Sequence, residues 1–198
     1  MRNTILCCFF LLCSNLLHAQ RGISLQLGYG TENNWGNTHF FAGLAFQKNL
    51  KNKFSYGINA TGLTTDINNA NKGSEGRPPF ETRRYNAFFL TAPFSYNIIG
   101  KNGNFFKWKL NAGPSLKIYS YNLLTQWRTI IHSDGSREWP AEYLKYEKKK
   151  GISLNLFVST DFTFKVNDNI NAGVLLETYT GKIFIEHFMP GIKVDYTF

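Results

Sequence analysis

Apolar and polar residues alternate along most of this chain, most strictly in its last nine positions, 190–198. One face of that segment is apolar or aromatic, with Ile192, Val194, Tyr196 and Phe198. Successive side chains of a β-strand point to opposite faces, so the pattern predicts a strand with one apolar face and one polar face. The same period recurs in seven earlier segments. The eight predicted strands are 23–30, 40–47, 54–61, 87–98, 106–119, 152–165, 170–177 and 186–198.

The connections between these segments alternate in length. Short, turn-like joins cover 48–52, 100–104 and 166–169, longer joins cover 31–38, 64–84 and 123–150, and the join at 180–185 is of modest length. Short turns at one end, long loops at the other and strands of about ten residues are typical of outer-membrane barrels. We therefore predict an all-β fold, an eight-stranded antiparallel up-and-down transmembrane β-barrel. Its apolar face would meet lipid, its small and polar face would line the interior, and its short turns would be periplasmic.

Aromatic residues on the apolar face cluster near the two ends of the predicted strands. At the short-turn end they are Phe46, Phe54, Tyr96, Phe106, Trp108, Phe164, Tyr196 and Phe198. At the long-loop end they are Tyr29, Phe40, Phe88 and Phe188. Aromatic rings collect at both interfaces of a membrane-spanning barrel, so these sets predict two girdles. Packing in a soluble core is the alternative.

The first nineteen residues, 1–19, have the layout of a secretory signal peptide. Arg2 precedes a nearly uninterrupted apolar run, and Ala19 provides a small residue at the expected cleavage position. All the cysteines, Cys7, Cys8 and Cys13, lie inside this segment. We expect an exported barrel domain, 20–198, that folds without disulfide bonds.

Two neighbouring segments carry a recognisable motif: Phe89-Leu90-Thr91-Ala92-Pro93-Phe94-Ser95-Tyr96 and Leu110-Asn111-Ala112-Gly113-Pro114-Ser115-Leu116. With the strand layout, this motif resembles the outer membrane protein β-barrel domain family of Gram-negative bacteria, which is akin to small OmpA/OmpX-type barrels. The resemblance implies an eight-stranded barrel in the cell outer membrane, with no catalytic residues to carry over. Pro93, Pro114 and Pro190 fall inside strands, where each removes a ladder hydrogen bond. We therefore expect local bulges or bends at these three prolines.

The polar face of the predicted strands carries charges of both signs, most of them near the short-turn end. Because eight strands enclose a space that side chains can fill, these groups predict a mixed-charge network inside the barrel. Its members are Lys107, Lys109, Asp161, Lys165, Glu177, Lys193 and Asp195. A narrow porin-like channel for small solutes is the alternative for the same interior.

The candidate chemistry along the chain is sparse. His132-Ser133-Asp134 contains the residue types of a hydrolase, but a catalytic triad requires side chains that converge in space, and Asp134-Gly135 favours a hairpin turn between arms 127–131 and 137–139. His39 and His187 fall near the outer rims of their strands. We predict no enzyme, cofactor or metal, and keep a lipid-modifying outer-membrane enzyme as an alternative.

The chain is basic, with a formal net charge of +9. An exported barrel rarely meets nucleic acid, so we expect the cationic loops to face lipopolysaccharide, with Lys148, Lys149 and Lys150 binding its phosphates. A solvated charge run is the alternative. Val194, Tyr196 and Phe198 would form the signal read by the barrel-assembly machinery.

We expect a non-catalytic integral outer-membrane protein, a monomer with a structural or surface-interaction role through its external loops. Besides the channel and the enzyme, a soluble periplasmic barrel that carries an apolar ligand stays open, because alternation alone also fits an apolar interior.

Overall fold

A computed structural model describes residues 21–32, 37–51, 53–66, 82–100, 105–181 and 185–198. The predicted signal peptide, 1–19, lies outside the described residues. Within the described ranges, no helix is both long enough and apolar enough to cross a membrane.

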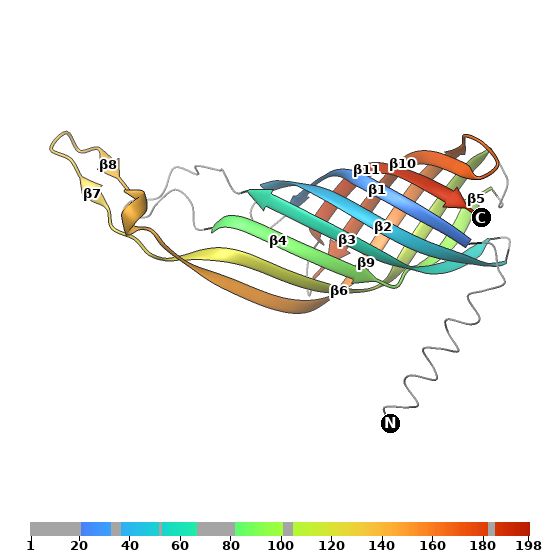
Figure 1. Cartoon of the computed structure of the whole chain (residues 1–198), viewed down its shortest axis with the longest axis horizontal. Coiled ribbons are helices and arrows are strands. Elements are labelled where there is room, and N and C mark those ends of the chain that lie inside the picture. Colours follow the sequence, from blue (N-terminus) through green and yellow to red (C-terminus); the bar gives the residue numbers. More distant parts are fainter. Residues whose placement is uncertain (1–20, 33–36, 52, 67–81, 101–104, 182–184) are drawn as a thin grey trace, which may run out of the picture.

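Antiparallel strands make up nearly all of the described structure (Figure 1). The strands of the barrel are β1 (Arg21–Glu32), β2 (Asn37–Lys51), β3 (Phe54–Asp66), β4 (Thr82–Thr91), β5 (Phe94–Ile99), β6 (Phe106–Gln126), β9 (Lys145–Lys165), β10 (Ile170–Thr180) and β11 (Ile185–Thr197). Strands β4 and β5 both lie between β3 and β6, so together they form one broken strand.

The strand pairing runs in a closed ring. Each strand pairs with its neighbours in the sequence, and β1 pairs with β11 from Gly22 opposite Thr197 to Glu32 opposite His187. With β4 and β5 counted as one, eight strands surround the interior. The predicted eight-stranded antiparallel up-and-down barrel is therefore confirmed.

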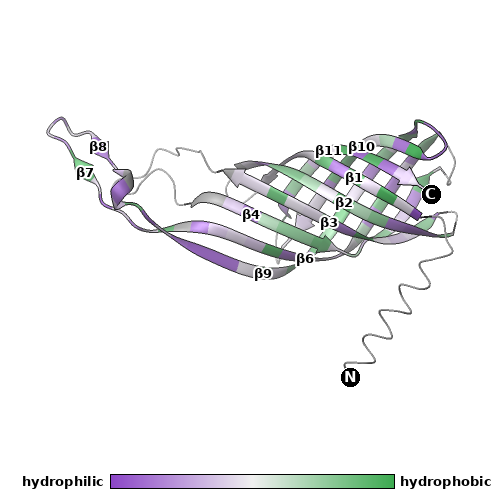
Figure 2. Cartoon of the chain, in the orientation of Figure 1, coloured by the Kyte–Doolittle hydropathy of each residue, from purple (hydrophilic) through white to green (hydrophobic). Residues whose placement is uncertain are grey.

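The apolar face of every strand points outward. The exposed fraction is 78 % for Leu154, 59 % for Ile192 and 52 % for Leu25, whereas Lys193 and Asp161 are 1 % and 3 % exposed. Figure 2 shows hydrophobic positions distributed over the barrel and hydrophilic ones along the projecting part of β9. A soluble carrier would bury the first group and expose the second, so this arrangement is that of a barrel surrounded by lipid.

The predicted aromatic girdles also face outward. Exposed rings at the short-turn end belong to Phe54, Tyr96, Phe164, Tyr196 and Phe198, and those at the other end belong to Tyr29, Phe40, Phe88 and Phe188. Neighbouring rings contact each other across strands, for example Tyr29 with Phe40, whose ring centroids are 5.7 Å apart.

The three strand prolines behave differently from one another. Pro93 breaks the fourth strand into β4 and β5, as expected. At Pro114 and Pro190 there is no bulge, since pairing keeps its register on both sides of each residue. The carbonyl of Pro114 accepts a hydrogen bond from the amide of Ala92, at the break between β4 and β5. Pro114, which has no N–H to donate, therefore lies beside the interrupted strand. The pairing of β1 with β11 is interrupted at Tyr29 and Gly30, beside Pro190, and resumes in the same register. The hydrogen bond that Pro190 cannot donate therefore interrupts the pairing but does not shift it.

The interior has two chemically distinct halves. The half nearer the short turns is polar, as predicted for the whole interior. The other half holds an aromatic core, which the prediction of a polar interior missed, together with buried polar side chains such as Lys117 and Asn155. This core consists of Phe41, Leu63, Tyr85, Ala87, Phe89, Phe157, Leu175, Tyr179 and Met189.

Glycines make room for these rings. A Cβ atom added to Gly28 or Gly191, which pair with each other across β1 and β11, would lie 2.7 or 2.8 Å from the ring of Phe41. The ring therefore packs directly on the backbone of two neighbouring strands. Such space-filling closes the middle of the barrel, as expected for eight strands.

Strands β6 and β9 continue far beyond the rest of the barrel. Their pairing extends to Gln126 opposite Lys145, although β9 leaves its other neighbour, β10, at Leu156, and β6 leaves β4 at Leu123. A second small hairpin, β7 (Ile130–Ile131) and β8 (Arg137–Glu138), caps the projection, and a short helix, η1 (Ala141–Tyr143), leads back into β9. The predicted hairpin is thus confirmed, but half of the predicted loop 123–150 is strand. Polar residues on both faces of the projection hid its strand pattern in the sequence.

Candidate functional site

The projecting part of β9 carries two predicted lysines on the outward face. Lys150 pairs with Ser120 and Lys148 with Asn122, one and two steps beyond the row formed by Ile118 and Ile152. Ile118 and Ile152 are both exposed at the end of the apolar surface. The change from apolar to cationic side chains therefore occurs within a single step along the strand.

The third predicted lysine faces the other way. Lys149 lies on the opposite face of β9, and its Nζ is 2.8 Å from a carboxylate oxygen of Glu147. The structure therefore separates Lys149 from Lys148 and Lys150. The sequence signal was the strand period itself, because neighbours in a strand point to opposite faces.

The cap of the projection is internally braced. The guanidinium of Arg128 lies 5.3 Å from the ring centroid of Tyr143, and the Trp139 indole donates a hydrogen bond to Thr129 at 3.1 Å. His132 contacts Glu138 at 3.1 Å. The carboxylate of Asp134 accepts a bond from the Ser136 amide, so His132, Ser133 and Asp134 form a turn rather than a triad.

The polar half of the interior is organised around one buried ion pair. Lys193 Nζ is 2.5 Å from Asp161 and 3.4 Å from Asp195, and the side chains of Lys193 and Asp161 are almost completely buried. Asn111 donates to the other oxygen of Asp161 at 3.0 Å. Three of the predicted network residues therefore meet in one cluster.

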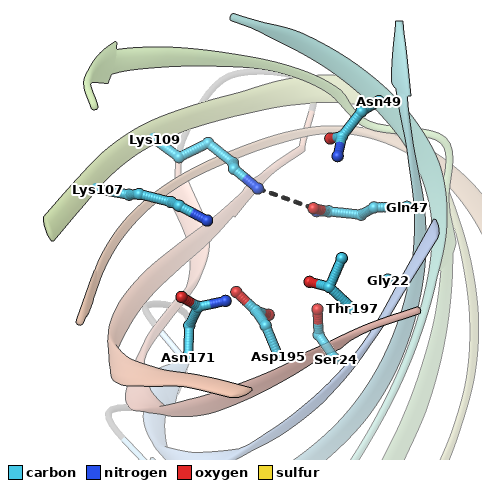
Figure 3. Close-up of a pocket in the computed structure, with 9 residues that line it drawn as sticks. All are labelled: Gly22, Ser24, Gln47, Asn49, Lys107, Lys109, Asn171, Asp195 and Thr197. Atoms are coloured by element: carbon cyan, nitrogen blue, oxygen red, sulfur yellow. Dashed lines mark hydrogen bonds between the residues drawn. The ribbon is translucent and has the colours of Figure 1, made fainter. Parts of the chain in front are cut away.

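The remaining network residues lie around this cluster. A small polar pocket at the short-turn end is lined in part by Lys107, Lys109 and Asp195, and Lys109 donates to Gln47 at 2.9 Å (Figure 3). Lys165 points to the rim, where it pairs with Asp168 of the β9–β10 turn at 2.7 Å. Lys165 is thereby tied to a turn rather than to an interior carboxylate.

Glu177 lies deeper, at the boundary with the aromatic core. It accepts a hydrogen bond from Asn59 at 3.3 Å and one from the Tyr179 hydroxyl at 3.5 Å. Its carboxylate is thus held by neutral donors. A separate interior ion pair joins Lys117 to Glu186 at 2.9 Å, and Asn155 donates to the same Glu186 oxygen.

Two histidines that we placed near the outer rims turn inward and meet. His39 on β2 and His187 on β11 are 2 % and 0 % exposed, with ring centroids 5.4 Å apart. Both occupy inward positions of their strands, and this was the only sequence signal for their meeting. Among the described residues, no group of three or more His, Cys, Asp or Glu side chains could hold a metal ion.

The residues expected to guide barrel assembly face the lipid side. Val194, Tyr196 and Phe198 are all exposed, and the rings of Tyr196 and Phe198 are 6.1 Å apart. The backbone of Phe198 exchanges two hydrogen bonds with Arg21, at 3.0 and 3.3 Å. The two ends of the barrel sheet are thereby joined.

No protein-family model matches this sequence, and no curated protein matches it. Solved structures do resemble the fold. A major outer membrane protein of Thermus thermophilus has a TM-score of 0.56 at 12 % identity, over 91 % of this chain and 100 % of that one. Neisserial surface protein A has a TM-score of 0.55 at 14 % identity, over 90 % of this chain and 96 % of that one.

A third similar structure is that of Ail, the attachment invasion locus protein of Yersinia pestis. It has a TM-score of 0.54 at 8 % identity, over 92 % of this chain and 100 % of that one. These likenesses agree with the closed ring of strands and with the lipid-facing surface described above. The chain has the fold of the small OmpA/OmpX-like β-barrels of the bacterial outer membrane.

Proposed function

We propose that this chain is a non-catalytic outer-membrane protein that works at the cell surface through its β6–β9 projection. One observation carries the proposal: an ordered, capped hairpin extends beyond a barrel whose middle is filled with side chains (Figure 1). A filled barrel offers no aqueous path, whereas a braced hairpin presents the same side chains continuously. The surface available for recognition is therefore outside the barrel.

The partner that best fits the base of the projection is lipopolysaccharide. Lys148 and Lys150 follow directly after the exposed apolar row of Ile118 and Ile152, on the same outward face. Side chains in that position meet the anionic headgroups of the surrounding leaflet. Ail has been solved in complex with the heparin analogue sucrose octasulfate, with a TM-score of 0.51 to this chain, so a barrel of similar fold accepts a polyanion.

The test compares two variants of the protein folded in detergent. Replacing Lys148 and Lys150 by Gln removes two outward cations, and each cation near an anionic membrane surface contributes about 1 kcal/mol. We expect the affinity for purified lipopolysaccharide to fall about thirtyfold and its salt dependence to weaken. Lys149→Gln is the matched control, because that side chain faces the other way and pairs with Glu147.

Heat-modifiable migration on a denaturing gel establishes that each variant is folded. Equal affinities for the Lys148/Lys150 double variant and the Lys149→Gln control would refute the assignment of the partner. A double variant that loses affinity while the control keeps it would support that assignment.

A further inference from the structure

Two buried imidazoles lie against each other in the outer half of the barrel. The rings of His39 and His187 are 5.4 Å apart between centroids, at an angle of 79°. None of their four ring nitrogens has a hydrogen-bond partner among the described residues. Buried polar atoms are nearly always hydrogen-bonded or bound to a metal, so this pair requires an explanation.

A thioether lies beside the same pair. Met189 is two residues from His187 on the inward face of β11 and is fully buried. Gly30 of β1, the strand between β2 and β11, separates it from His39. A Cβ atom added to Gly30 would lie 2.5 Å from His39 Nε2 and 2.7 Å from Met189 Cγ. The imidazole nitrogen and the methionine side chain therefore meet in the space above this glycine.

The walls around this group are mainly aromatic, with one cation behind them, since Lys117 Nζ lies 5.6 Å from the ring centroid of Tyr85. The ring of Phe89 packs edge-on against His187 at 5.3 Å, and the ring of Tyr85 stacks on it at 6.1 Å. The nearby carboxylate of Glu186 is already bound to Lys117 and Asn155. The potential donors in this group are thus two imidazoles and one thioether, all of them almost completely buried.

We propose that His39, His187 and Met189 form a binding site for a single copper(I) ion inside the barrel. Thioether ligands select copper(I), and imidazole is a good copper ligand, whereas harder metals favour the carboxylates that this group lacks. With a metal–nitrogen bond of about 2 Å, two imidazoles on a trigonal ion have ring centroids about 5.5 Å apart. The observed separation of 5.4 Å matches this value.

The inference is independent of the β6–β9 projection, since the site lies on β2 and β11. The proposed site also explains why residue 30 is a glycine, because any side chain there would occupy the space between His39 and Met189. Zinc is the natural competitor for two imidazoles, but structural zinc sites take four ligands, commonly including thiolates. The thioether of Met189 is therefore the group that favours copper(I) over zinc(II).

The experiment uses untagged protein extracted from outer membranes in detergent. Copper(I), generated with ascorbate under argon, is titrated against a coloured copper(I) chelator, with zinc(II) in a parallel titration. We expect one copper per chain. His39→Gln and His187→Gln should each weaken binding at least about 100-fold, since even the outer-shell partners of metal ligands are worth up to that much. His132→Gln, an exposed histidine of the cap, is the matched control and should not change it.

Met189→Leu distinguishes a copper site from a general imidazole site. It keeps an apolar side chain of similar size, so we expect copper(I) affinity to fall while zinc(II) binding stays unchanged. X-ray absorption of the copper-loaded wild-type protein should show two nitrogen neighbours and one sulfur neighbour, and the sulfur should vanish in Met189→Leu. The sequence has only one other methionine, Met1.

Each remaining outcome overturns the proposal. Failure of the wild-type protein to retain copper(I) against the chelator would do so, as would equal affinities in wild type and histidine variants. A copper spectrum without sulfur, or tighter retention of zinc than of copper, would remove the assignment of the metal. The absorption measurement on wild-type protein needs no variant, so it decides the matter even where a histidine variant fails to fold.

Discussion

The ion pair between Lys193 and Asp161 offers the sharpest test of the polar half of the interior. Both side chains are almost completely buried, and Asp195 lies 3.4 Å from the same ammonium group. Lys193→Met keeps most of the side-chain volume but leaves the Asp161 carboxylate with Asn111 as its remaining partner in the cluster. Breaking a buried pair in this way costs about 3–5 kcal/mol, because one charge stays desolvated. We therefore expect the equilibrium constant for folding to fall about a thousandfold.

The measurement is reversible urea unfolding in lipid vesicles, followed by tryptophan fluorescence and by heat-modifiable gel migration. A second variant combines Lys193→Met with Asp161→Asn. It removes both charges and retains the acceptor for Asn111, so it should recover all but about 1–2 kcal/mol of wild-type stability. Lys107→Met, at the polar pocket by the mouth of the barrel, is the control and should change stability by less than about 1 kcal/mol.

The free energies of unfolding of the three variants, compared with one another, test this reasoning. If Lys193→Met destabilised the barrel no more than Lys107→Met, the pair would not be a desolvated unit. If the double variant were less stable than Lys193→Met alone, the cost would come from lost packing rather than from an unpaired carboxylate.

Further predictions concern the core, the channel, assembly and the cap. Gly28→Val should destabilise the barrel by at least about 2 kcal/mol in urea, because a Cβ atom there meets an aromatic ring and a backbone carbonyl. Gly62→Val, where the added atom meets nothing within 4 Å, should not, and equal effects would contradict the packing argument. Planar bilayers should show a closed trace, and a steady conductance would show that the aromatic core is not a plug. Phe198→Ala should lower the level in outer membranes without slowing folding into vesicles, whereas slower folding in vitro would remove the role in assembly. Hydrogen bonds from the side chain and from the amide of Ser136 hold the pKa of Asp134 below its usual 3.8. Ser136→Ala removes the side-chain bond, so it should raise that pKa in an NMR titration. The contribution of this bond to the cap is present at neutral pH and is lost as the pH falls through the lowered pKa. An unchanged pKa of Asp134 in this variant would contradict the hydrogen bond from the Ser136 side chain.

The outward face of the barrel was predictable because lipid imposes one requirement on every strand. Leu25, Leu154 and Ile192 had to be apolar whatever their neighbours, so a two-residue period located them without knowledge of the pairing. The cap hairpin was predictable for a similar reason. Its turn depends on local chemistry, and Gly135 has the positive φ of 81° that such a turn requires.

The inward face could not be predicted in the same way, because its side chains are chosen by partners across the barrel. Phe41 fits only where Gly28 and Gly191 of two other strands leave space for it. His39 and His187 belong to strands at opposite ends of the sequence, and they meet because β1 lies between those strands. The register of three strands had to be known before any of these contacts could be inferred.

The division of the interior also bears on function. A water-filled channel needs a continuous polar lining, yet the charged cluster around Lys193 ends where the aromatic core begins. Our two proposals concern different parts of the molecule: the β6–β9 projection, and the enclosed group of His39, His187 and Met189. Because these two lie on different strands, losing one in a variant should leave the other intact.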